Sequence, residues 1–377
     1  MGVEFQRIQR KGRGILFVIL ILGAIIGYQL GYMLGAEKPT DDFLTMVYSS
    51  EKEGWIGELV GPFKTWYFQH FNRTIAVNFR SMGSLEMVVA LQTGEIKPII
   101  WSPASELQVG FCNASIPNMI NYANVTSFIY SPTIICVWSN TPYTNITGFE
   151  DLRNLSISNN IRFAHTDPRL SNSGYTGVLM EIAAYFNSTT HAFYNASRIV
   201  LANLTDAYHI NDNLATWLRD IEQRAIYYGT STGYLVKKAS TDYDVFYAYE
   251  NLIIDLNRDP TLGKKAIAIY PKEGLFINKH PFCILNASWV TPHDRLVAGR
   301  YLQFLGLNSS ISAAFSRGFR PLDTSILANS TYNQTFNQYF NAQYGVSYSP
   351  SFLVHGVPTD QNVLNSVSDV WLEVRAE

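Results

Sequence analysis

The sequence predicts an α/β protein with mostly parallel sheets and two lobes. Strand-like and helix-like segments alternate along most of the chain, a pattern typical of helices that cover a parallel sheet. The length of 377 residues favours two domains over one. A continuous apolar run, SPTIICVW (131–138), is followed by a polar stretch, which indicates a strand that crosses from one lobe into the next.

The individual elements follow from local patterns. FLTMVY (43–48) is a buried strand, and Ser50 to Glu53 has the spacing of a capping box that starts a helix. TIAVNFR (74–80) is the next strand, and its following helix stops at Gly94. Further strands are expected at 97–101, 161–165, 225–228, 266–271 and 281–290, and further helices at 178–186, 232–238 and 296–306.

The N-terminus predicts a membrane anchor. Four basic residues lie within residues 1–14, and Ile15 to Gly35 contains no charged residue. Such a run can span a bilayer, and the basic flank places residues 1–14 in the cytoplasm and the remainder outside the cell. We expect a single transmembrane helix over 15–36. A cleaved secretory signal is the alternative, and processing at Arg13-Gly14 would resemble the pilin-like signals of some archaeal surface proteins.

The sequence after this segment indicates an exported glycoprotein. The Asn-x-Ser/Thr sequons are dense and all follow the apolar segment, which suits a glycosylated extracellular surface. They begin at Asn72, Asn113, Asn124, Asn145, Asn154, Asn187, Asn195, Asn203, Asn286, Asn308, Asn329 and Asn333. Cys112, Cys136 and Cys283 permit one disulfide outside the cell, or they stay buried and unpaired.

Composition argues against several function classes. Charged residues make up 15% of the chain and the net charge is −2, so the basic face of a nucleic-acid-binding protein is not expected. The sequence contains no HExxH, no P-loop and no GxGxxG. We therefore expect no nucleic acid, no cofactor and no enzymatic activity.

Four strand-to-helix turns carry hydroxyl or amide groups at the start of a helix. Helix N-termini present unpaired N–H groups and partial positive charge, so such turns can bind anions. The same residue types are ordinary helix N-caps, and that reading stays open. Nearby Glu51, Glu53, Glu86 and Asp167 oppose a purely anionic site unless they point away. The turns hold Ser49 and Ser50, Ser81 and Ser84, Asn172 and Ser173, and Ser231 and Thr232.

At these motifs the sequence resembles a known family. SSEKEGWI, MGSLEMVVALQTGEIKP, WSPASEL, SPTII, HTDPRLSNSGYTGVL, YYGTSTGYL, IYPKEG and GFRP, in this order, are similar to extracellular solute-binding proteins of ABC transporters. The nearest group is the type II periplasmic-binding-protein-like one, which includes molybdate and iron binders. The resemblance implies lobe 1 over 43–137 and 271–345, lobe 2 over 138–270, and a cleft between them. Residues 346–377 are expected to form an irregular C-terminal extension.

The resemblance also implies a site and partners. The solute, with an oxyanion or a metal ion favoured, would be delivered to an ABC transporter permease by an archaeal version tethered to the cell membrane. Tyr227 and Tyr228 would bind a ferric ion, or else pack within a strand. The crossing segments would be neighbours, which implies a Cys136–Cys283 disulfide. The implied ligand-binding residues are Ser49, Ser50, Ser81, Gly83, Ser84, Ser102, Ser131, Asn172, Ser173, Gly174, Tyr228, Ser231 and Thr232.

Other interpretations remain. A structural or adhesive surface glycoprotein can be built on the same fold. Gly229 to Gly233 fits the G-x-S-x-G of a serine hydrolase with Ser231 as nucleophile, followed by candidate acids and histidines. Asp242-Tyr243-Asp244 resembles the metal-binding motif of glycosyltransferases. Glu250 and Arg169 could contact a charged ligand, and their default interpretation is as solvated surface residues.

Overall fold

A computed structural model describes residues 41–158, 161–206 and 209–376. Among the helices of these residues, none is both long enough and apolar enough to cross a membrane. The expected transmembrane helix over 15–36 lies outside the described residues, as does the cytoplasmic segment 1–14.

The first sheet has five strands in the order β2-β1-β3-β13-β4. Strand β1 pairs in parallel with β2 and β3, whereas β13 pairs antiparallel with β3 and β4. We call this sheet and its helices lobe 1. Its strands are β1 (Asp42–Ser49), β2 (Ile75–Met82), β3 (Ile100–Ser102), β4 (Ile120–Thr126) and β13 (Phe282–Leu285).

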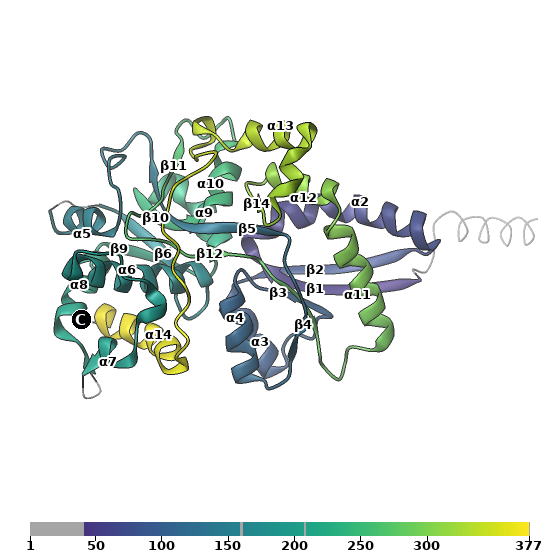
Figure 1. Cartoon of the computed structure of the whole chain (residues 1–377), viewed down its shortest axis with the longest axis horizontal. Helices are drawn as coiled ribbons and strands as arrows, with labels where there is room; N and C mark the ends of the chain where they lie inside the picture. The colour runs from purple at the N-terminus through teal and green to yellow at the C-terminus, as the bar shows by residue number, and fades with distance from the viewer. Residues whose placement is uncertain (1–40, 159–160, 207–208, 377) are drawn as a thin grey trace, which may run out of the picture. The chain divides into compact units, whose positions relative to one another are not determined.

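The second sheet has the order β11-β5-β10-β6-β9, and we call it and its helices lobe 2. Figure 1 shows β5 running from the lobe 1 side into this sheet. Two short strands, β12 and β14, also pair with β5. The strands are β5 (Ile129–Trp138), β6 (Phe163–Thr166), β9 (Ala225–Gly229), β10 (Val245–Tyr249), β11 (Ala266–Ile269), β12 (Ile277–Asn278) and β14 (Arg320–Pro321). A separate pair joins β7 (Thr205–Asp206) to β8 (His209–Ile210).

Helices flank both sheets. Figure 1 shows α2 on one side of the first sheet and α3 and α4 on the other. In lobe 2, α5, α6, α8 and α14 pack together, and α9 packs against α10. The α-helices are α2 (Glu53–Phe71), α3 (Ser84–Thr93), α4 (Glu106–Ser115), α5 (Phe149–Ser158), α6 (Asn172–Thr190), α7 (Leu201–Leu204), α8 (Asp212–Glu222), α9 (Thr232–Asp242), α10 (Glu250–Asn257), α11 (Pro292–Leu305), α12 (Asn308–Phe315), α13 (Ser330–Tyr339) and α14 (Gln361–Ala376). The 3-10 helices are η1 (Ser50–Lys52), η2 (Ala196–Arg198), η3 (Thr324–Ala328) and η4 (Ala342–Tyr344).

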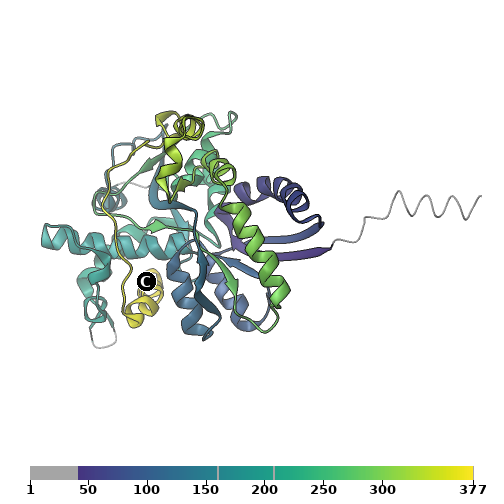
Figure 2. The same ribbon diagram turned by 45° about the vertical axis from the view of Figure 1, so that its right-hand side comes forward.

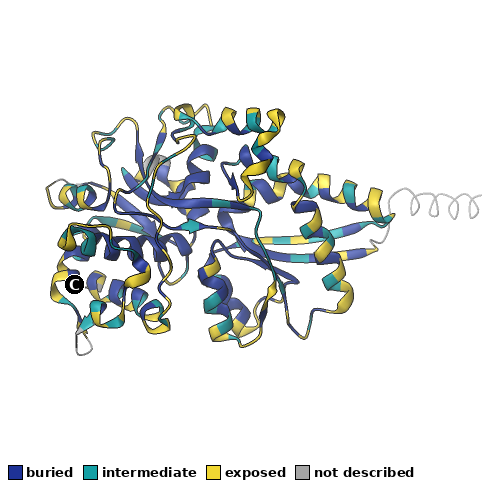
Figure 3. Ribbon diagram, viewed as in Figure 1, coloured by how far each residue is buried: buried dark blue, intermediate teal, exposed yellow. Residues whose placement is uncertain are grey.

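Each lobe has its own hydrophobic core, and Figure 3 shows the buried strands at the centre of both. The three cysteines are buried and free, so the expected Cys136–Cys283 disulfide is wrong. Cys136 lies in the core of lobe 2 and Cys283 in that of lobe 1. Within the returning segment 266–285, the part nearest Cys283 that pairs with β5 is β12, which meets it at Ser131 and Pro132. Cys136 lies further along β5 and faces other strands.

Residues 346–377 are expected to be irregular, and this prediction is wrong for the last part of the segment. An irregular segment crosses lobe 2, as Figure 2 shows, and ends in helix α14. Because its buried residues recur every three or four positions, one face of α14 packs against α6 and α8. This helix was not predicted from the sequence because valine is a weak helix former and the segment is rich in Asn and Ser. The buried residues of α14 are Val363, Val367, Val370, Trp371 and Val374.

Candidate functional site

The polar turns predicted from the sequence meet where the two lobes touch. At the start of α3, the backbone N–H groups of Leu85 and Glu86 both donate to the carbonyl oxygen of Leu170, each at 3.0 Å. Leu170 belongs to lobe 2 and lies just before α6. A Cβ atom on Gly83 would lie 2.6 Å from this oxygen and 2.6 Å from the carbonyl oxygen of Thr230. The N-terminus of α3 therefore touches two turns of the other lobe directly.

A second interlobe contact joins the turn after β1 to the start of α9. The Ser50 hydroxyl accepts a hydrogen bond from the Gly233 N–H at 3.1 Å. The Asn251 amide donates to the carbonyl oxygen of Glu51 at 3.2 Å. The expected Ser50–Glu53 capping box is wrong, because no side chain caps η1 or α2 and Ser50 bonds to lobe 2 instead.

Asn172 forms a third interlobe contact. This residue is fully buried at the start of α6. Its Oδ1 accepts from Nε2 of Gln108, a lobe 1 residue, at 2.6 Å. Its Nδ2 donates to the Tyr249 hydroxyl at 2.9 Å and to Oδ1 of Asn278 at 2.7 Å. Asn172 and its three polar partners are all buried, so this network is enclosed in the interface between the lobes.

Within lobe 2, the turns before α6 and α9 are bonded to each other. The Ser173 hydroxyl lies 2.7 Å from that of Thr232 and 2.9 Å from that of Thr166. The Gly174 N–H donates to the Thr166 hydroxyl at 2.7 Å. A Cβ atom on Gly174 would lie 1.9 Å from the Thr166 carbonyl oxygen, so this close approach requires glycine.

The remaining predicted serines of lobe 1 and β5 lie near this interface, and most are bonded to neighbouring groups. Ser81 is half-buried. The bonds are Ser84 Oγ accepting from Ala104 N at 3.1 Å, Ser102 Oγ donating to Pro281 O at 2.8 Å, Ser131 Oγ accepting from Asn251 N at 3.1 Å, and Ser49 Oγ donating to the Glu51 carboxylate.

The tyrosine pair lies apart from the other predicted site residues. The Tyr228 hydroxyl donates to Oε2 of Glu222 at 2.8 Å, in a buried cluster beside His165. Tyr227 points to the opposite face of β9 and stacks on Tyr243, with ring centroids 5.7 Å apart. Successive side chains of a strand face opposite ways, so the two hydroxyls do not converge on one ion.

The enzyme motifs are not completed in space. Among the described residues, the buried Ser231 hydroxyl has no hydrogen-bond partner, whereas a serine nucleophile needs a base within hydrogen-bond reach. Among the candidate partners, His293 bonds to Asp42 in lobe 1 and Asp244 pairs with Arg162. In the described part of the chain, no three His, Cys, Asp or Glu side chains gather as a metal site.

The interface also buries charged groups that sequence patterns did not select. Lys52 is fully buried, and its ammonium donates to the carbonyl oxygens of Ser102 and Pro103 at 2.9 and 2.8 Å. Burial lowers the pKa of Lys52 to about 7, although Glu51 favours its charged form. Nδ1 of His280 lies 3.1 Å from Oε1 of Glu51. The sequence signal was a polar Ser-Glu-Lys run that directly follows a buried strand.

Glu51 remains ionised despite its burial. Burial alone would raise the pKa of its carboxyl group, but His280, Lys52 and the Ser49 hydroxyl outweigh this effect and lower the pKa below its usual value. Burial also lowers the pKa of His280 to about 4, and the charge of Lys52 acts in the same direction. The interface therefore contains a carboxylate beside a neutral imidazole at neutral pH.

Apart from Nδ1 of His280, which lies 3.1 Å from Oε1 of Glu51, three buried polar atoms of this region have no hydrogen-bond partner in the described structure. They are Oγ of Ser231, Oδ1 of Asn251 and Nε2 of His280. Buried polar groups normally find a partner, because leaving one unsatisfied costs about 1–3 kcal/mol. Three such atoms therefore lie at the interface between the lobes.

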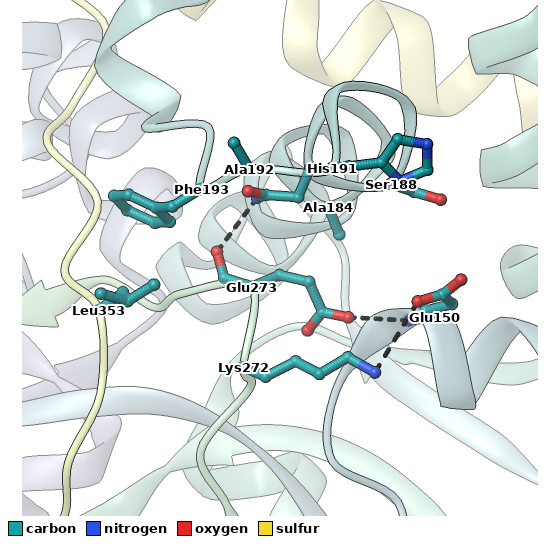
Figure 4. Close-up of a pocket in the computed structure, with 10 residues that line it drawn as sticks. Glu150, Ala184, Ser188, His191, Ala192, Phe193, Lys272, Glu273 and Leu353 are labelled. Carbon is teal, nitrogen blue, oxygen red and sulfur yellow. Dashed lines mark hydrogen bonds and ion pairs between the residues drawn. The ribbon is translucent and has the colours of Figure 1, made fainter.

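A separate cavity of about 430 Å³ lies in lobe 2 and is drawn in Figure 4. Its central carboxylate, Glu273, accepts from the N–H groups of Phe149 and Glu150 at 3.1 and 3.2 Å and so caps α5. Lys272 lies 3.8 Å from the Glu150 carboxylate. Because these groups satisfy one another, the cavity makes a weaker candidate site than the interface between the lobes.

Comparison with solved structures gives the fold class. The sulfate-binding protein SubI from Mycobacterium tuberculosis H37Rv aligns with a TM-score of 0.58 and 15% identity, over 84% of this chain and 94% of that protein. A periplasmic thiamin-binding protein aligns with a TM-score of 0.64 and 13% identity, over 89% of this chain and 96% of that one. This chain has the fold of periplasmic solute-binding proteins.

A third structure agrees with this fold. A Trichodesmium protein in complex with iron and citrate aligns with a TM-score of 0.52 and 11% identity, over 88% of this chain and 99% of that one. No protein-family model matches the sequence, and no curated protein matches it either. The structure confirms the expected α/β fold of binding proteins, but the expected mostly parallel sheets are wrong. Strands β5 and β13 pair antiparallel with their neighbours, so both sheets are mixed. The identity of the solute depends on this chain's own residues.

We expect stability to fall in acid because of His280. The unfolded chain protonates this side chain near pH 6.5, whereas the folded protein does so only near pH 4, so unfolding is favoured progressively as pH falls through this window. One pKa unit corresponds to about 1.4 kcal/mol, so the expected loss is of the order of 3 kcal/mol. Urea unfolding of the full chain at pH 7 and pH 4.5 measures it.

His280→Asn provides the comparison, since asparagine does not titrate and tolerates the positive φ of this position, 46°. The variant should lose clearly less stability on acidification than the wild type. His191→Asn is the matched control, because His191 also has a positive φ, 55°, but is exposed. An equal acid dependence in the wild type and His280→Asn would contradict the assignment.

Proposed function

We propose that this protein is a cell-surface solute-binding protein that captures a small solute between its two lobes and delivers it to an ABC transporter permease. The observation that carries the proposal is the buried polar interface between the lobes, with three unpartnered polar atoms and an ionised carboxylate. Binding proteins of this architecture hold ligands at the carboxyl ends of their strands, which is where these turns lie.

The proposed location is the outer face of the cell membrane, with the apolar segment 15–36 as anchor and residues 1–14 in the cytoplasm. Exposed sequon asparagines support an extracellular, glycosylated surface; they are Asn72, Asn145, Asn154, Asn286, Asn308 and Asn329. An anchored binding protein would stay close to its permease.

A thermal-shift screen of the full chain in detergent tests solute capture. Candidate solutes are sulfate, molybdate, phosphate, ferric citrate, glucose, thiamin, ethanolamine and 1,4-diaminobutane. A ligand at 100 times its Kd stabilises the folded state by about 2.7 kcal/mol, so a true ligand should raise Tm by several degrees. The Asn172→Ala variant should reduce that rise, because Asn172 links residues of both lobes.

A structural surface glycoprotein is the second candidate. It is favoured by the way the lobes already bond to each other, with the carbonyl oxygen of Leu170 satisfying two N–H groups at the start of α3. If no solute in the screen changes Tm, this second function is preferred over transport.

A further inference from the structure

The sequon asparagines differ in how the fold uses their side-chain amides. In N-linked glycosylation, a sugar is transferred to Nδ2 of asparagine from a donor that holds the sugar through its C1 atom on a phosphate group. The C1–O bond to the phosphate breaks, a C1–N bond forms, and the proton that Nδ2 loses goes to the leaving phosphate. The folded protein therefore accepts a glycan only where one Nδ2 hydrogen is free to be replaced.

Asn187 has no such hydrogen. Its Nδ2 donates to the carbonyl oxygens of Ala183 at 2.9 Å and Glu273 at 3.2 Å, and the carbonyl oxygen of Tyr194 lies 3.5 Å away. Its Oδ1 accepts a hydrogen bond from the Tyr194 N–H. An asparagine amide nitrogen carries two hydrogens, and backbone carbonyl oxygens of this chain accept both.

The bonds of Asn187 join separate segments of lobe 2. They tie α6 to the chain that follows it and to the segment between β11 and β12. Asn187 also lines the cavity of about 430 Å³ in lobe 2, so space lies beside it. Even so, a sugar on Nδ2 would replace a hydrogen that bonds to a carbonyl oxygen, and one of these ties would be lost.

Asn113 is engaged in a different way. It lies near the end of α4, where its Oδ1 accepts from the N–H of Ile120 and its Nδ2 donates to the carbonyl oxygen of the same residue, both at 2.9 Å. Because both bonds reach one residue, the donating hydrogen lies on the same side of the C–N bond as Oδ1. Substituted amides strongly prefer the trans form, which puts the sugar carbon in that position. A glycan on Asn113 would therefore break the bond that ties α4 to the start of β4.

A second group of sequon asparagines has the opposite surroundings. They are exposed, and among the described residues their side chains form no hydrogen bond. A sugar on Nδ2 would therefore replace a bond to water, and no contact of the fold would be lost. The group consists of Asn72 at the end of α2, Asn145 before α5, Asn154 within α5 and Asn308 at the start of α12.

We propose that N-linked glycans attach to Asn72, Asn145, Asn154 and Asn308, and that Asn113 and Asn187 stay unmodified because their amides hold the fold together. This inference rests on the cell-surface location proposed above. It divides the sequons by the hydrogen bonds of Nδ2, which the sequon pattern does not reveal.

Mass spectrometry of proteolytic peptides tests the proposal. The full chain is purified from the membranes of the cells that naturally produce it, and the fraction of each sequon asparagine that carries a sugar is measured. We expect sugar on the exposed group, with an occupancy at least tenfold higher than at Asn113 or Asn187.

A pair of matched variants gives an independent readout. Asn187→Gln should lower Tm by several degrees, because the longer side chain does not keep the bonds to Ala183, Tyr194 and Glu273. It should leave the glycan mass of the full chain unchanged. Asn145→Gln is the control, and it should lower that mass by one glycan. Loss of glycan mass in Asn187→Gln, with Tm unchanged, would contradict the structural role of this amide.

The outcomes distinguish the inference from the proposed location. Sugar on Asn113 or Asn187 at the occupancy of the exposed group overturns the division of the sequons but leaves the cell-surface location standing. The absence of sugar from every sequon overturns the inference together with the glycosylated surface, while the thermal-shift screen still decides solute capture. If Asn187→Gln does not fold, the occupancies in the wild type decide the proposal by themselves.

Discussion

Glu250→Gln should destabilise the protein by about 3–5 kcal/mol. The Glu250 carboxylate accepts from Nε and Nη2 of Arg320 at 2.6 and 2.9 Å, and both side chains are buried. Removing one charge of a buried, hydrogen-bonded pair leaves the other uncompensated, which is the costly case. The Tyr270 hydroxyl also bonds to this carboxylate and would lose a charged acceptor.

The Glu250–Arg320 pair also affects the contacts that Arg320 makes with other segments. Arg320 lies in β14 beside β5, and its guanidinium also donates to the carbonyl oxygens of Ser347 and Tyr348. It thus ties the irregular C-terminal segment to the strand that crosses between the lobes. Loss of Glu250 should loosen this segment as well as lower the stability of the whole protein.

Urea and thermal unfolding of the full chain measure the Glu250→Gln effect. Glu58→Gln is the matched control, since Glu58 pairs with Arg317 at 3.0 Å but is 45% exposed; its expected cost is about 0–1 kcal/mol. The double variant Glu250→Gln, Arg320→Met should recover part of the lost stability. If Glu250→Gln and Glu58→Gln lowered the free energy of unfolding equally, the buried pair would contribute no more to stability than the exposed pair, contrary to this prediction.

Sequence patterns predicted the fold well because periodicity is a local property. Apolar runs such as FLTMVY and SPTIICVW became β1 and β5, and Gly94 ends α3 with a φ of 75°. The C-terminal helix was not predicted. Its apolar face consists mainly of valines, and the many polar residues between them favoured an irregular segment over a helix. The burial of α14 against lobe 2 overrides the weak helix propensity of these residues.

The site was only partly predictable. The helix-start turns were found, because small polar residues between strand and helix are a local signal, and the structure brings most of them together. Glu250 was read as a solvated surface residue since its partner, Arg320, is distant in sequence and no local pattern reveals the pairing. His280 was missed for the same reason, because its neighbour in the structure, Glu51, is distant in the sequence.

Long-range pairing also explains the errors. The crossing segments do lie side by side, but β11 and β12 pair with β5, whereas β13, which contains Cys283, pairs with β3 and β4. A cysteine pairing depends on such register to within one or two residues, which the sequence does not contain. Tyr227 and Tyr228 are adjacent in sequence, and the side chains of adjacent residues in a strand point to opposite faces of the sheet.

Gly83→Ala should hold the two lobes apart. The added Cβ would lie 2.6 Å from the carbonyl oxygens of both Leu170 and Thr230, and neither is a flexible side chain that can move aside. Each lobe folds around its own core, so the strain is relieved by separating the lobes at this point. We expect a larger radius of gyration in small-angle X-ray scattering and at least tenfold weaker solute binding.

Gly57→Ala is the matched control for Gly83→Ala. Gly57 lies within α2, and a Cβ there would meet no atom within 4 Å, so alanine should stabilise the helix by about 0.5–1 kcal/mol and leave the lobes in contact. Hydrogen exchange adds a local readout, because separation of the lobes frees the Leu85 and Glu86 N–H groups from Leu170. Faster exchange at these two amides in Gly83→Ala, but not in Gly57→Ala, would tie weaker binding to lobe separation. Unchanged exchange and affinity in Gly83→Ala would instead mean that solute capture does not require this contact.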